Sequence, residues 1–324
     1  MRVLAGDVGG TNARLAIADL AGGTPRIVKE RRYSSADAPG LAPIVGRFLD
    51  WAGEDVERAC FGIAGPVVDG ECRTPNLPWT VSARALARDI GIPATSIIND
   101  FVAAAYGVGC LGPADLVTLQ EGKPAERGTI ALIGAGTGLG QGFLVWDGAR
   151  YRVQASEGGH ADFAADGEAT WTLRMSLVDE WGRVSWERVL SGAGLAHLYR
   201  HLAAGGLADE RPDVRREMVD GDPAAVVTRH ALEGDDPISV KSLEVFVTAY
   251  GAQAGNLALT VLATGGVYLA GGIAPRIVSK LRDGTFIRAF RNKGRLAELM
   301  NRIPVHVIVS PDVGLLGAAC AAAE

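Results

Sequence analysis

The fold is decided by a glycine-rich turn near the N-terminus, residues 6–12, which reads Gly6-Asp7-Val8-Gly9-Gly10-Thr11-Asn12. An apolar strand is expected before this turn, at residues 3–5, and a second strand directly after it, at residues 14–18. A turn between two strands forms a hairpin, whereas a dinucleotide-binding fingerprint must open a helix. The sequence therefore predicts an N-terminal hairpin and argues against a Rossmann motif there.

The same pattern returns in the middle of the chain. An apolar strand is expected at residues 129–133 and a returning strand at residues 142–146. The turn between them, residues 134–140, reads Gly134-Ala135-Gly136-Thr137-Gly138-Leu139-Gly140. Because the short motif occurs twice, we expect a duplicated domain with a ligand between its halves.

The rest of the chain alternates between strand and helix patterns. Strands are expected at residues 60–64, 96–98, 267–270 and 305–309, and helices at residues 41–51 and 82–90, from residue 99, across most of residues 168–262 and from residue 315. Within the long helical region, residues 207–222 are polar and predict an exposed insert. This alternation indicates an α/β architecture.

The two glycine turns suit the binding of a polyphosphate. Glycine lets backbone N–H groups approach a phosphate closely, and Thr11 and Asn12 add neutral donors. Asp7, at the end of its strand, is placed to hold a hydrated Mg²⁺. One such turn also fits a plain tight hairpin. The second turn, at Gly136-Thr137-Gly138, favours a clamp on either side of a polyphosphate.

A carboxylate at the end of another predicted strand suits proton transfer. Asn99 and Asp100 follow the apolar residues 96–98, at the sheet edge where α/β proteins bind ligands. Phosphoryl transfer to a hydroxyl needs a group that accepts the hydroxyl proton. The alternative is structural, because a carboxylate at a helix start also suits an N-cap.

Two further polar segments suit a hydroxyl-rich ligand. Glu157 and His160 flank two glycines in a tight turn, and Glu187 precedes an apolar pair. A sugar needs such fixed donors and acceptors, because a missing partner leaves a buried polar group unpaired. The alternatives are a hydrogen-bonded loop for the first segment and a solvated helix residue for Glu187.

Composition excludes several classes of protein. The 324 residues carry 32 Lys and Arg and 37 Asp and Glu, giving a net charge of −5. This mild acidity argues against a nucleic-acid partner and a polybasic membrane partner. The uncharged residues 245–275 predict a buried helix followed by a core strand, with a membrane span as the alternative. At about 150 residues per domain, the length predicts two domains.

The cysteine and histidine spacings predict no metal site. The four cysteines, Cys60, Cys72, Cys110 and Cys320, contain no CxxC pair, which favours buried or bystander thiols in a reducing cytoplasm. His197 and His201 lie four residues apart on a predicted helix, without an obvious third ligand nearby. We expect them on an exposed helix face rather than around a metal.

Taken together, these segments resemble bacterial ATP-dependent glucokinases of the hexokinase–actin superfamily. The matching segments occur in family order over nearly the whole chain, at residues 6–14, 98–101, 136–140, 157–160, 187–192 and 270–276. The resemblance implies an α/β, two-domain actin-like (ribonuclease H-like) fold with a duplicated core and an interdomain cleft. Residues 1–110 and 310–324 would form the small domain, and residues 111–309 the large one.

The resemblance also implies transfer of the γ-phosphoryl group of Mg-ATP to the 6-hydroxyl of glucose, a step of glycolysis, with Asp100 as general base. The residues it assigns to the sugar are Asn76, Asn99, Asp100, Glu157, His160 and Glu187. Those it assigns to ATP are Gly6, Asp7, Val8, Gly9, Gly10, Thr11, Asn12, Gly136, Thr137, Gly138, Gly271 and Gly272, with Asp7 also binding Mg²⁺ through water.

Two alternatives stay open at this point: a kinase for another hexose, such as mannose, and a non-catalytic sugar sensor on the same fold. Asp7, Asp100 and the two turns favour a kinase, because a pure binder needs no proton acceptor. We expect a cytoplasmic protein, and helices rich in small residues make a homodimer plausible. The sequence leaves open the regulation, any phosphoryl donor other than ATP, and the role of residues 207–222.

Overall fold

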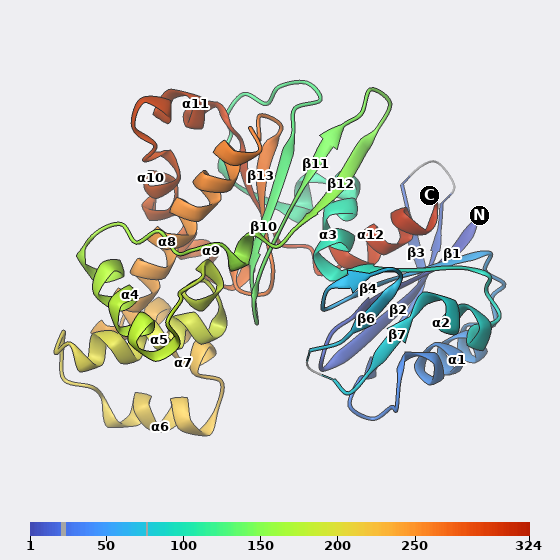
Figure 1. The fold of residues 1–324 in the computed structure, drawn as a ribbon, viewed down its shortest axis with the longest axis horizontal. Coiled ribbons are helices and arrows are strands. Elements are labelled where there is room, and N and C mark those ends of the chain that lie inside the picture. Colours follow the sequence, from blue (N-terminus) through green and yellow to red (C-terminus); the bar gives the residue numbers. More distant parts are fainter. Residues whose placement is uncertain (21–23, 76) are drawn as a thin grey trace. The chain divides into compact units, whose positions relative to one another are not determined.

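In the computed structural model, residues 1–20, 24–75 and 77–324 are described. Their contacts divide them into two compact units. Unit 1 comprises Met1–Asp115 and Ser310–Glu324, and unit 2 comprises Leu116–Val309. The sequence predicted these boundaries after residues 110 and 309. Each unit packs helices against a mixed sheet (Figure 1), so the predicted α/β class is confirmed.

The sheet of unit 1 has the strand order β3-β2-β1-β4-β8. Its strands are β1 (Arg2–Val8), β2 (Asn12–Asp19), β3 (Arg26–Ser34), β4 (Arg58–Ile63) and β8 (Ala94–Asn99). Strand β1 pairs antiparallel with β2 and parallel with β4, which pairs parallel with β8. The carboxyl ends of the three parallel strands therefore meet at one edge, where Val8, Ile63 and Asn99 are in register.

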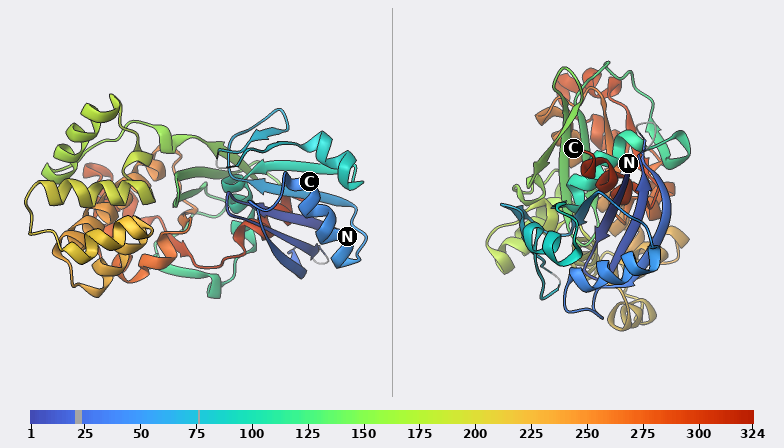
Figure 2. Two further views of the ribbon diagram at one scale, coloured as in Figure 1. Left: turned by 90° about the horizontal axis from the view of Figure 1, so that it is seen from below. Right: turned by 90° about the vertical axis from the view of Figure 1, so that its right-hand side faces the viewer.

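Helices cover both faces of this sheet. They are α1 (Leu41–Ala52), α2 (Ala83–Ile90), α3 (Asp100–Gly107) and α12 (Val313–Ala322). Phe48 of α1 and Leu86 of α2 join the core on one face, and Leu315 of α12 packs on the other. At Gly317 of α12, an added Cβ would collide with the carbonyl of Ala103 in α3, so this glycine permits close packing of the two helices. The two chain ends lie near each other in unit 1 (Figure 2).

Unit 1 also contains smaller elements. They are the three-stranded sheet of β5 (Val67–Val68), β6 (Glu71–Arg73) and β7 (Thr80–Ser82), and the 3₁₀ turns η1 (Val108–Cys110) and η2 (Pro113–Asp115). Ser82 stands at the N-cap position of α2, as expected, but its side chain makes no capping hydrogen bond with any described residue.

The sheet of unit 2 has the strand order β12-β11-β10-β13-β14-β9. Its strands are β9 (Leu116–Gln120), β10 (Ile130–Ala135), β11 (Leu139–Trp146), β12 (Tyr151–Ser156), β13 (Gly266–Ala270) and β14 (Val305–Ile308). Strand β10 pairs antiparallel with β11 and parallel with β13, which pairs parallel with β14. The first five strands repeat the order and directions found in unit 1, so the predicted duplication is confirmed.

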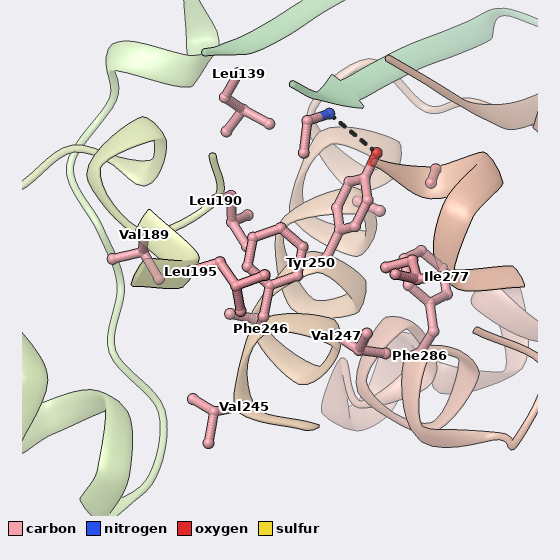
Figure 3. Close-up of a cluster of buried hydrophobic side chains, with 14 of the residues drawn as sticks. Leu139, Val189, Leu190, Leu195, Val245, Phe246, Val247, Tyr250, Ile277 and Phe286 are labelled. Atoms are coloured by element: carbon pink, nitrogen blue, oxygen red, sulfur yellow. Dashed lines mark hydrogen bonds between the residues drawn. The ribbon is translucent and has the colours of Figure 1, made fainter. Parts of the chain in front are cut away.

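Several helices of unit 2 pack directly on one long helix, α8. The helices of this unit are α4 (Glu168–Trp181), α5 (Gly192–Ala204), α6 (Pro212–Asp220), α7 (Pro223–Glu233), α8 (Pro237–Thr260), α9 (Val278–Leu281), α10 (Thr285–Arg291) and α11 (Ala297–Arg302), with 3₁₀ turns η3 (Gly158–His160), η4 (Trp186–Arg188), η5 (Ala274–Ile277) and η6 (Gly294–Leu296). Phe246 and Tyr250 of α8 pack with Leu195 of α5 and Phe286 of α10 in one buried cluster (Figure 3).

The uncharged stretch at residues 245–275 contains the end of α8 and strand β13, as the favoured interpretation predicted. Among the described helices, none is both long and apolar enough to cross a membrane.

Two expectations for the helical region are corrected. The insert at residues 207–222 contains helix α6, and two of its apolar side chains are buried, so the segment is only partly exposed. His197 and His201 are half-buried rather than exposed. Their face of α5 packs on α4: the ring of His197 lies against Trp181, and His201 contacts the hydroxyl of Thr172 at 3.1 Å.

The thiol prediction holds for two of the four cysteines. Cys60 and Cys72 are buried in unit 1. Cys110 and Cys320 are half-exposed, and their sulfur atoms lie 3.0 Å apart, so these two are not bystanders.

Candidate active site

The hairpin turn between β1 and β2 presents backbone N–H groups at the carboxyl edge of the unit 1 sheet. The amide of Gly9 donates to the carbonyl of Asn12 at 2.9 Å, which closes the turn. Ser35 braces it: its hydroxyl donates to the carbonyl of Gly9 and its amide to the carbonyl of Thr11, both at 2.9 Å. The amides of Gly10 and Thr11 donate to no atom of the described residues, so both can bind an anion.

The other predicted residues of this turn have distinct places. Gly6 lies inside β1, where an added Cβ would collide with the ring of Phe61, so packing alone requires glycine there. Val8 is buried and anchors the end of the strand in the core. Thr11 and Asn12 are exposed at the turn, where their side chains can add donors to those of the backbone.

Asp7 is a half-buried carboxylate beside this turn. Burial raises the pKa of its carboxyl group, whereas the nearby charges of Arg14 and Arg32 lower it. An added Cβ on Gly314, near the start of α12, would lie 3.3 Å from Oδ2 of Asp7, so glycine keeps that side of the carboxylate uncrowded. An oxygen ligand in this position fits a hydrated hard cation such as Mg²⁺.

The turn from β8 into α3 is fixed by Asn99. Its Oδ1 accepts hydrogen bonds from the amides of Phe101 at 2.9 Å and Val102 at 3.2 Å, and its Nδ2 donates to the carbonyl of Gly65 at 3.0 Å. Asn99 is therefore the N-cap of α3, and the capping role considered for Asp100 belongs to its neighbour. Asp100 is the first residue of the helix.

The carboxyl group of Asp100 is electrostatically unusual. Burial raises its pKa to about 6, and the nearby charge of Asp7 adds to this shift, while hydrogen bonds from the amide of Phe101 and the side chain of Asn99 oppose it. A carboxylate with a pKa near 6 is largely ionised at neutral pH and still a useful base. These properties suit a proton acceptor.

The glycine turn of unit 2 is closed in a similar way. The amide of Gly136 donates to the carbonyl of Gly138 at 2.8 Å, and the amide of Gly192 at the start of α5 donates to the carbonyl of Gly136 at 2.9 Å. Thr137 is exposed at the apex of the turn. The start of α5 is thereby fixed against the turn, so two glycine segments meet at the carboxyl end of β10.

Gly271 and Gly272 form a third glycine segment at the same edge, after the parallel neighbour β13. Gly271 has a φ of +79°, and an added Cβ would lie 2.5 Å from the carbonyl oxygen of Ala135. An added Cβ on Gly136 would lie 3.8 Å from the amide nitrogen of Gly272. Beneath them, the hydroxyl of Tyr250 accepts from the amide of Ala135 at 3.3 Å (Figure 3). The turn at residues 136–138 and the segment Gly271-Gly272 are therefore adjacent, and α8 supports them through Tyr250.

Unit 2 brings together the three polar side chains that the sequence assigned to a sugar. One ring nitrogen of His160 lies 3.8 Å from a carboxylate oxygen of Glu157, and the other lies 3.8 Å from Glu187. Glu187 also accepts a hydrogen bond from the amide of Leu139 at 3.0 Å, directly after the glycine turn. An added Cβ on Gly159 would collide with the carbonyl of Leu139, so this glycine allows the close approach.

Two residues that support these turns were not predicted from the sequence. Ser35 braces the first turn and Tyr250 supports the second, and each is far along the chain from the turn it contacts. Asn76, also predicted to bind the sugar, lies outside the described residues.

Comparison with known proteins identifies the family. A family model described as Glucokinase matches residues 4–324. The glucokinase of Trichormus variabilis is 44% identical over 338 aligned positions, covering 99% of both chains.

The chain belongs to the glucokinase family. Among solved structures, a glucokinase from an Antarctic psychrotroph matches with a TM-score of 0.87 and 32% identity, covering 99% of this chain and 98% of that one. A ROK-family glucokinase from Streptomyces griseus, in complex with glucose and AMPPNP, matches in fold, with a TM-score of 0.69, 22% identity and coverage of 100% of this chain and 99% of that one.

Within this glucokinase-family chain, the predicted residues fall into two groups. Asp7, Asn99 and Asp100 lie in unit 1, together with the first glycine turn. Glu157, His160 and Glu187 lie in unit 2 with the other two glycine segments. Each unit therefore contains one glycine hairpin and its own set of polar side chains.

Proposed function

We propose that this chain transfers the γ-phosphoryl group of ATP to the 6-hydroxyl of glucose, giving glucose 6-phosphate and ADP. The observation that carries the proposal is the match to the Glucokinase family model over residues 4–324, with 44% identity to a full-length glucokinase. The fold shared with a glucokinase that binds glucose and AMPPNP supports both substrates.

In this proposal, Asp100 accepts the proton of the 6-hydroxyl as its oxygen attacks the γ-phosphorus. The pKa of about 6 supports this role, because the group is ionised at neutral pH and can take up a proton as negative charge leaves the attacking oxygen. Asn99 supports the base indirectly by capping α3, and it is retained as a sugar ligand in this proposal.

The glycine segments take the nucleotide. The amides of Gly10 and Thr11, and the turn at residues 136–138, donate to phosphate oxygens, and Gly271 with Gly272 takes the adenosine side. Backbone donors held by the surrounding fold need little reorganisation as charge develops, which lowers the barrier for transfer.

Asp7 is the residue that fits a magnesium ion. Its carboxylate lies at a strand end beside the phosphate-binding turn, with space preserved by Gly314, and would hold the ion through water. When bound, Mg²⁺ neutralises charge on the phosphate oxygens.

Glu157, His160 and Glu187 bind the other hydroxyls of glucose in this proposal, and Asn76 is retained as a further sugar ligand. His160 lies 3.8 Å from both carboxylates, so the three side chains offer donors and acceptors side by side. Such an array discriminates among sugars, because an epimer leaves one of its groups unpaired.

We also propose a place for the protein in the cell: a cytoplasmic enzyme of glycolysis that acts as a homodimer. The mild acidity of the chain and its helices rich in small residues support this setting. Sedimentation of the purified protein would report the oligomeric state.

The test is formation of glucose 6-phosphate from Mg-ATP by the purified chain, with fructose, mannose and N-acetylglucosamine as competing substrates. We expect glucose to give the highest kcat/KM. A higher kcat/KM for another hexose would replace glucose as the substrate. Glucose binding by calorimetry without turnover of any sugar would instead identify a sensor and overturn the proposal.

A further inference from the structure

Two thiols meet where α3 and α12 end. Cys110 is the last residue of η1, which directly follows α3, and Cys320 lies in the last turns of α12. Their sulfur atoms are 3.0 Å apart, and both side chains are half-exposed. The other two cysteines of the chain, Cys60 and Cys72, are buried. Only the first pair combines contact with access to a reagent in solution.

The packing between the helices keeps the two sulfurs together. Besides the close approach at Gly317, an added Cβ on Gly107 would collide with the backbone of Val313. Because both glycines place backbone against backbone, the helices cannot slide apart without losing buried contacts. The thiols are thus held as neighbours by the fold, although they lie 210 positions apart in the sequence.

We propose that Cys110 and Cys320 form an oxidation site that closes to a reversible intramolecular disulfide by exchange with a small-molecule disulfide such as oxidised glutathione. The sulfurs need to approach by about 1 Å to reach bonding distance, a shift within the reach of side-chain rotation. The site lies at the opposite ends of α3 and α12 from Asp100 and Gly314.

The exchange has two balanced steps. The Cys110 thiolate attacks one sulfur of oxidised glutathione, forming a mixed disulfide and releasing one glutathione thiolate. The Cys320 thiolate then attacks the Cys110 sulfur of that mixed disulfide and releases the second glutathione. Overall, two protein thiols are oxidised, and one glutathione disulfide is reduced to two thiols.

The surroundings favour this order of attack. A hydrogen bond from the Cys320 thiol lowers the pKa of Cys110. The same contact raises the pKa of Cys320, and burial and the charge of Glu324 add to that shift. These directions favour Cys110 as the first nucleophile; attack by Cys320 first would give the same disulfide. Once Cys110 is part of a mixed disulfide, its hydrogen bond with Cys320, the largest cause of the raised pKa of Cys320, is lost.

The disulfide would tie the C-terminal helix to the helix that carries Asp100. Closing a loop of this length restricts the unfolded chain strongly, so we expect the oxidised form to melt at a temperature on the order of 5 °C higher than the reduced form. We expect kcat to change less than about twofold, because the bond lies far along both helices from the proposed site.

The experiment treats the full chain with oxidised glutathione, removes the reagent, and measures intact mass, alkylation by iodoacetamide under denaturing conditions, and melting temperature. We expect the chain to lose two hydrogens, about 2 Da, to keep two alkylatable thiols, and to recover four after reduction. Cys110→Ser and Cys320→Ser should each abolish the mass loss and the rise in melting temperature, and Cys60→Ser serves as the matched control that keeps both.

Three outcomes would overturn the proposal. One is a stable glutathione adduct on Cys110 or Cys320 in the wild-type chain. A second is a disulfide between two chains on a non-reducing gel. The third is four alkylatable thiols after treatment. None of these measurements depends on kinase activity, so they remain decisive whatever the outcome for the proposed function.

Discussion

The two hairpins of the duplicated core differ most at one position of their register. In unit 1, the second pair of facing residues, counted from the turn of the hairpin, is Asp7 opposite Arg14. In unit 2, the corresponding pair is Gly134 opposite Gly140. The strand order is the same and the turns are closed in a similar way, yet one copy has a charged pair at this position and the other has two glycines.

This difference shows that the two copies of the core carry different chemical groups on a similar backbone. Unit 1 keeps its carboxylates, Asp7 and Asp100, at the ends of core strands. The polar groups of unit 2, Glu157, His160 and Glu187, come from segments outside the repeated strands. We infer that the shared backbone sets where phosphates can bind, while the side chains unique to each copy decide between proton transfer and sugar recognition.

The largest effect is expected for Asp100→Asn, which removes the proposed base and keeps the shape of the side chain. We expect kcat to fall by roughly 10²–10⁴-fold while glucose binding by calorimetry stays within a few-fold. Asp89→Asn, at an exposed position of α2, is the matched control and should keep full activity. A kcat within tenfold of wild type for Asp100→Asn would remove Asp100 from the role of base.

The same variant links activity to stability. Because the base must be ionised, kcat/KM of the wild type should fall with decreasing pH below about 6, and this limb should be absent in any residual activity of Asp100→Asn. The pKa is raised on folding from its ordinary 3.8, so the folded state is disfavoured as pH rises through about 6. At pH 7.5 the variant should therefore unfold with a free energy about 1–3 kcal/mol higher than wild type in urea titrations.

A smaller effect is expected for Glu187→Ala, which probes whether unit 2 links sugar recognition to the glycine turn. Glu187 lies beside His160 and accepts from the amide of Leu139 at 3.0 Å. Its loss should raise KM for glucose by roughly 10–100-fold and KM for ATP by a smaller factor, because the turn loses an anchor. Glu187→Gln keeps an acceptor for Leu139 and should spare KM for ATP; equal effects of the two variants on KM for ATP would contradict this link.

The two turns can be compared directly by placing a methyl group in each. In unit 2, Gly138→Ala would set its Cβ 2.5 Å from Oε2 of Glu187, so that carboxylate must move. In unit 1, the Cβ of Gly9→Ala would lie 3.6 Å from the carbonyl of Asn12, an ordinary contact. We expect kcat/KM to fall roughly tenfold for the first variant and about twofold for the second. Each variant is assayed at the same interval below its own melting temperature. The reverse order would show that unit 1 has the tighter turn.

Much of the core could be predicted because glycine turns interrupt apolar runs. The predicted strand at residues 14–18 lies within β2, and the predicted strand at residues 129–133 overlaps β10. The edge strand β3 was not predicted, since Arg26–Ser34 carries several charged side chains and little apolar alternation. Charged residues on an edge strand prevent pairing with other chains, and they also hide the strand from a hydrophobic pattern.

The site was predictable in its residue types and not in its contacts. The carboxylates at strand ends and the glycine turns could be recognised because each needs only a few neighbouring residues. The bond from Leu139 to Glu187 joins residues 48 positions apart, and that from Ala135, at the end of β10, to Tyr250 joins residues 115 apart. Such bonds depend on how helices pack, which a single sequence does not encode in any short pattern.

A smaller effect than that of Gly138→Ala is expected for Ser35→Ala, which removes one of these long-range contacts from the unit 1 turn. Ser35 is fully buried, and its hydroxyl donates to the carbonyl of Gly9 at 2.9 Å. Without it we expect a loss of about 1–2 kcal/mol in the free energy of unfolding and a rise of a few-fold in KM for ATP. Ser34→Ala, at the neighbouring half-buried position, is the control. If Ser35→Ala lowers stability but leaves KM for ATP at the wild-type value, the serine only supports the fold, and the amides of Gly10 and Thr11 are positioned without it.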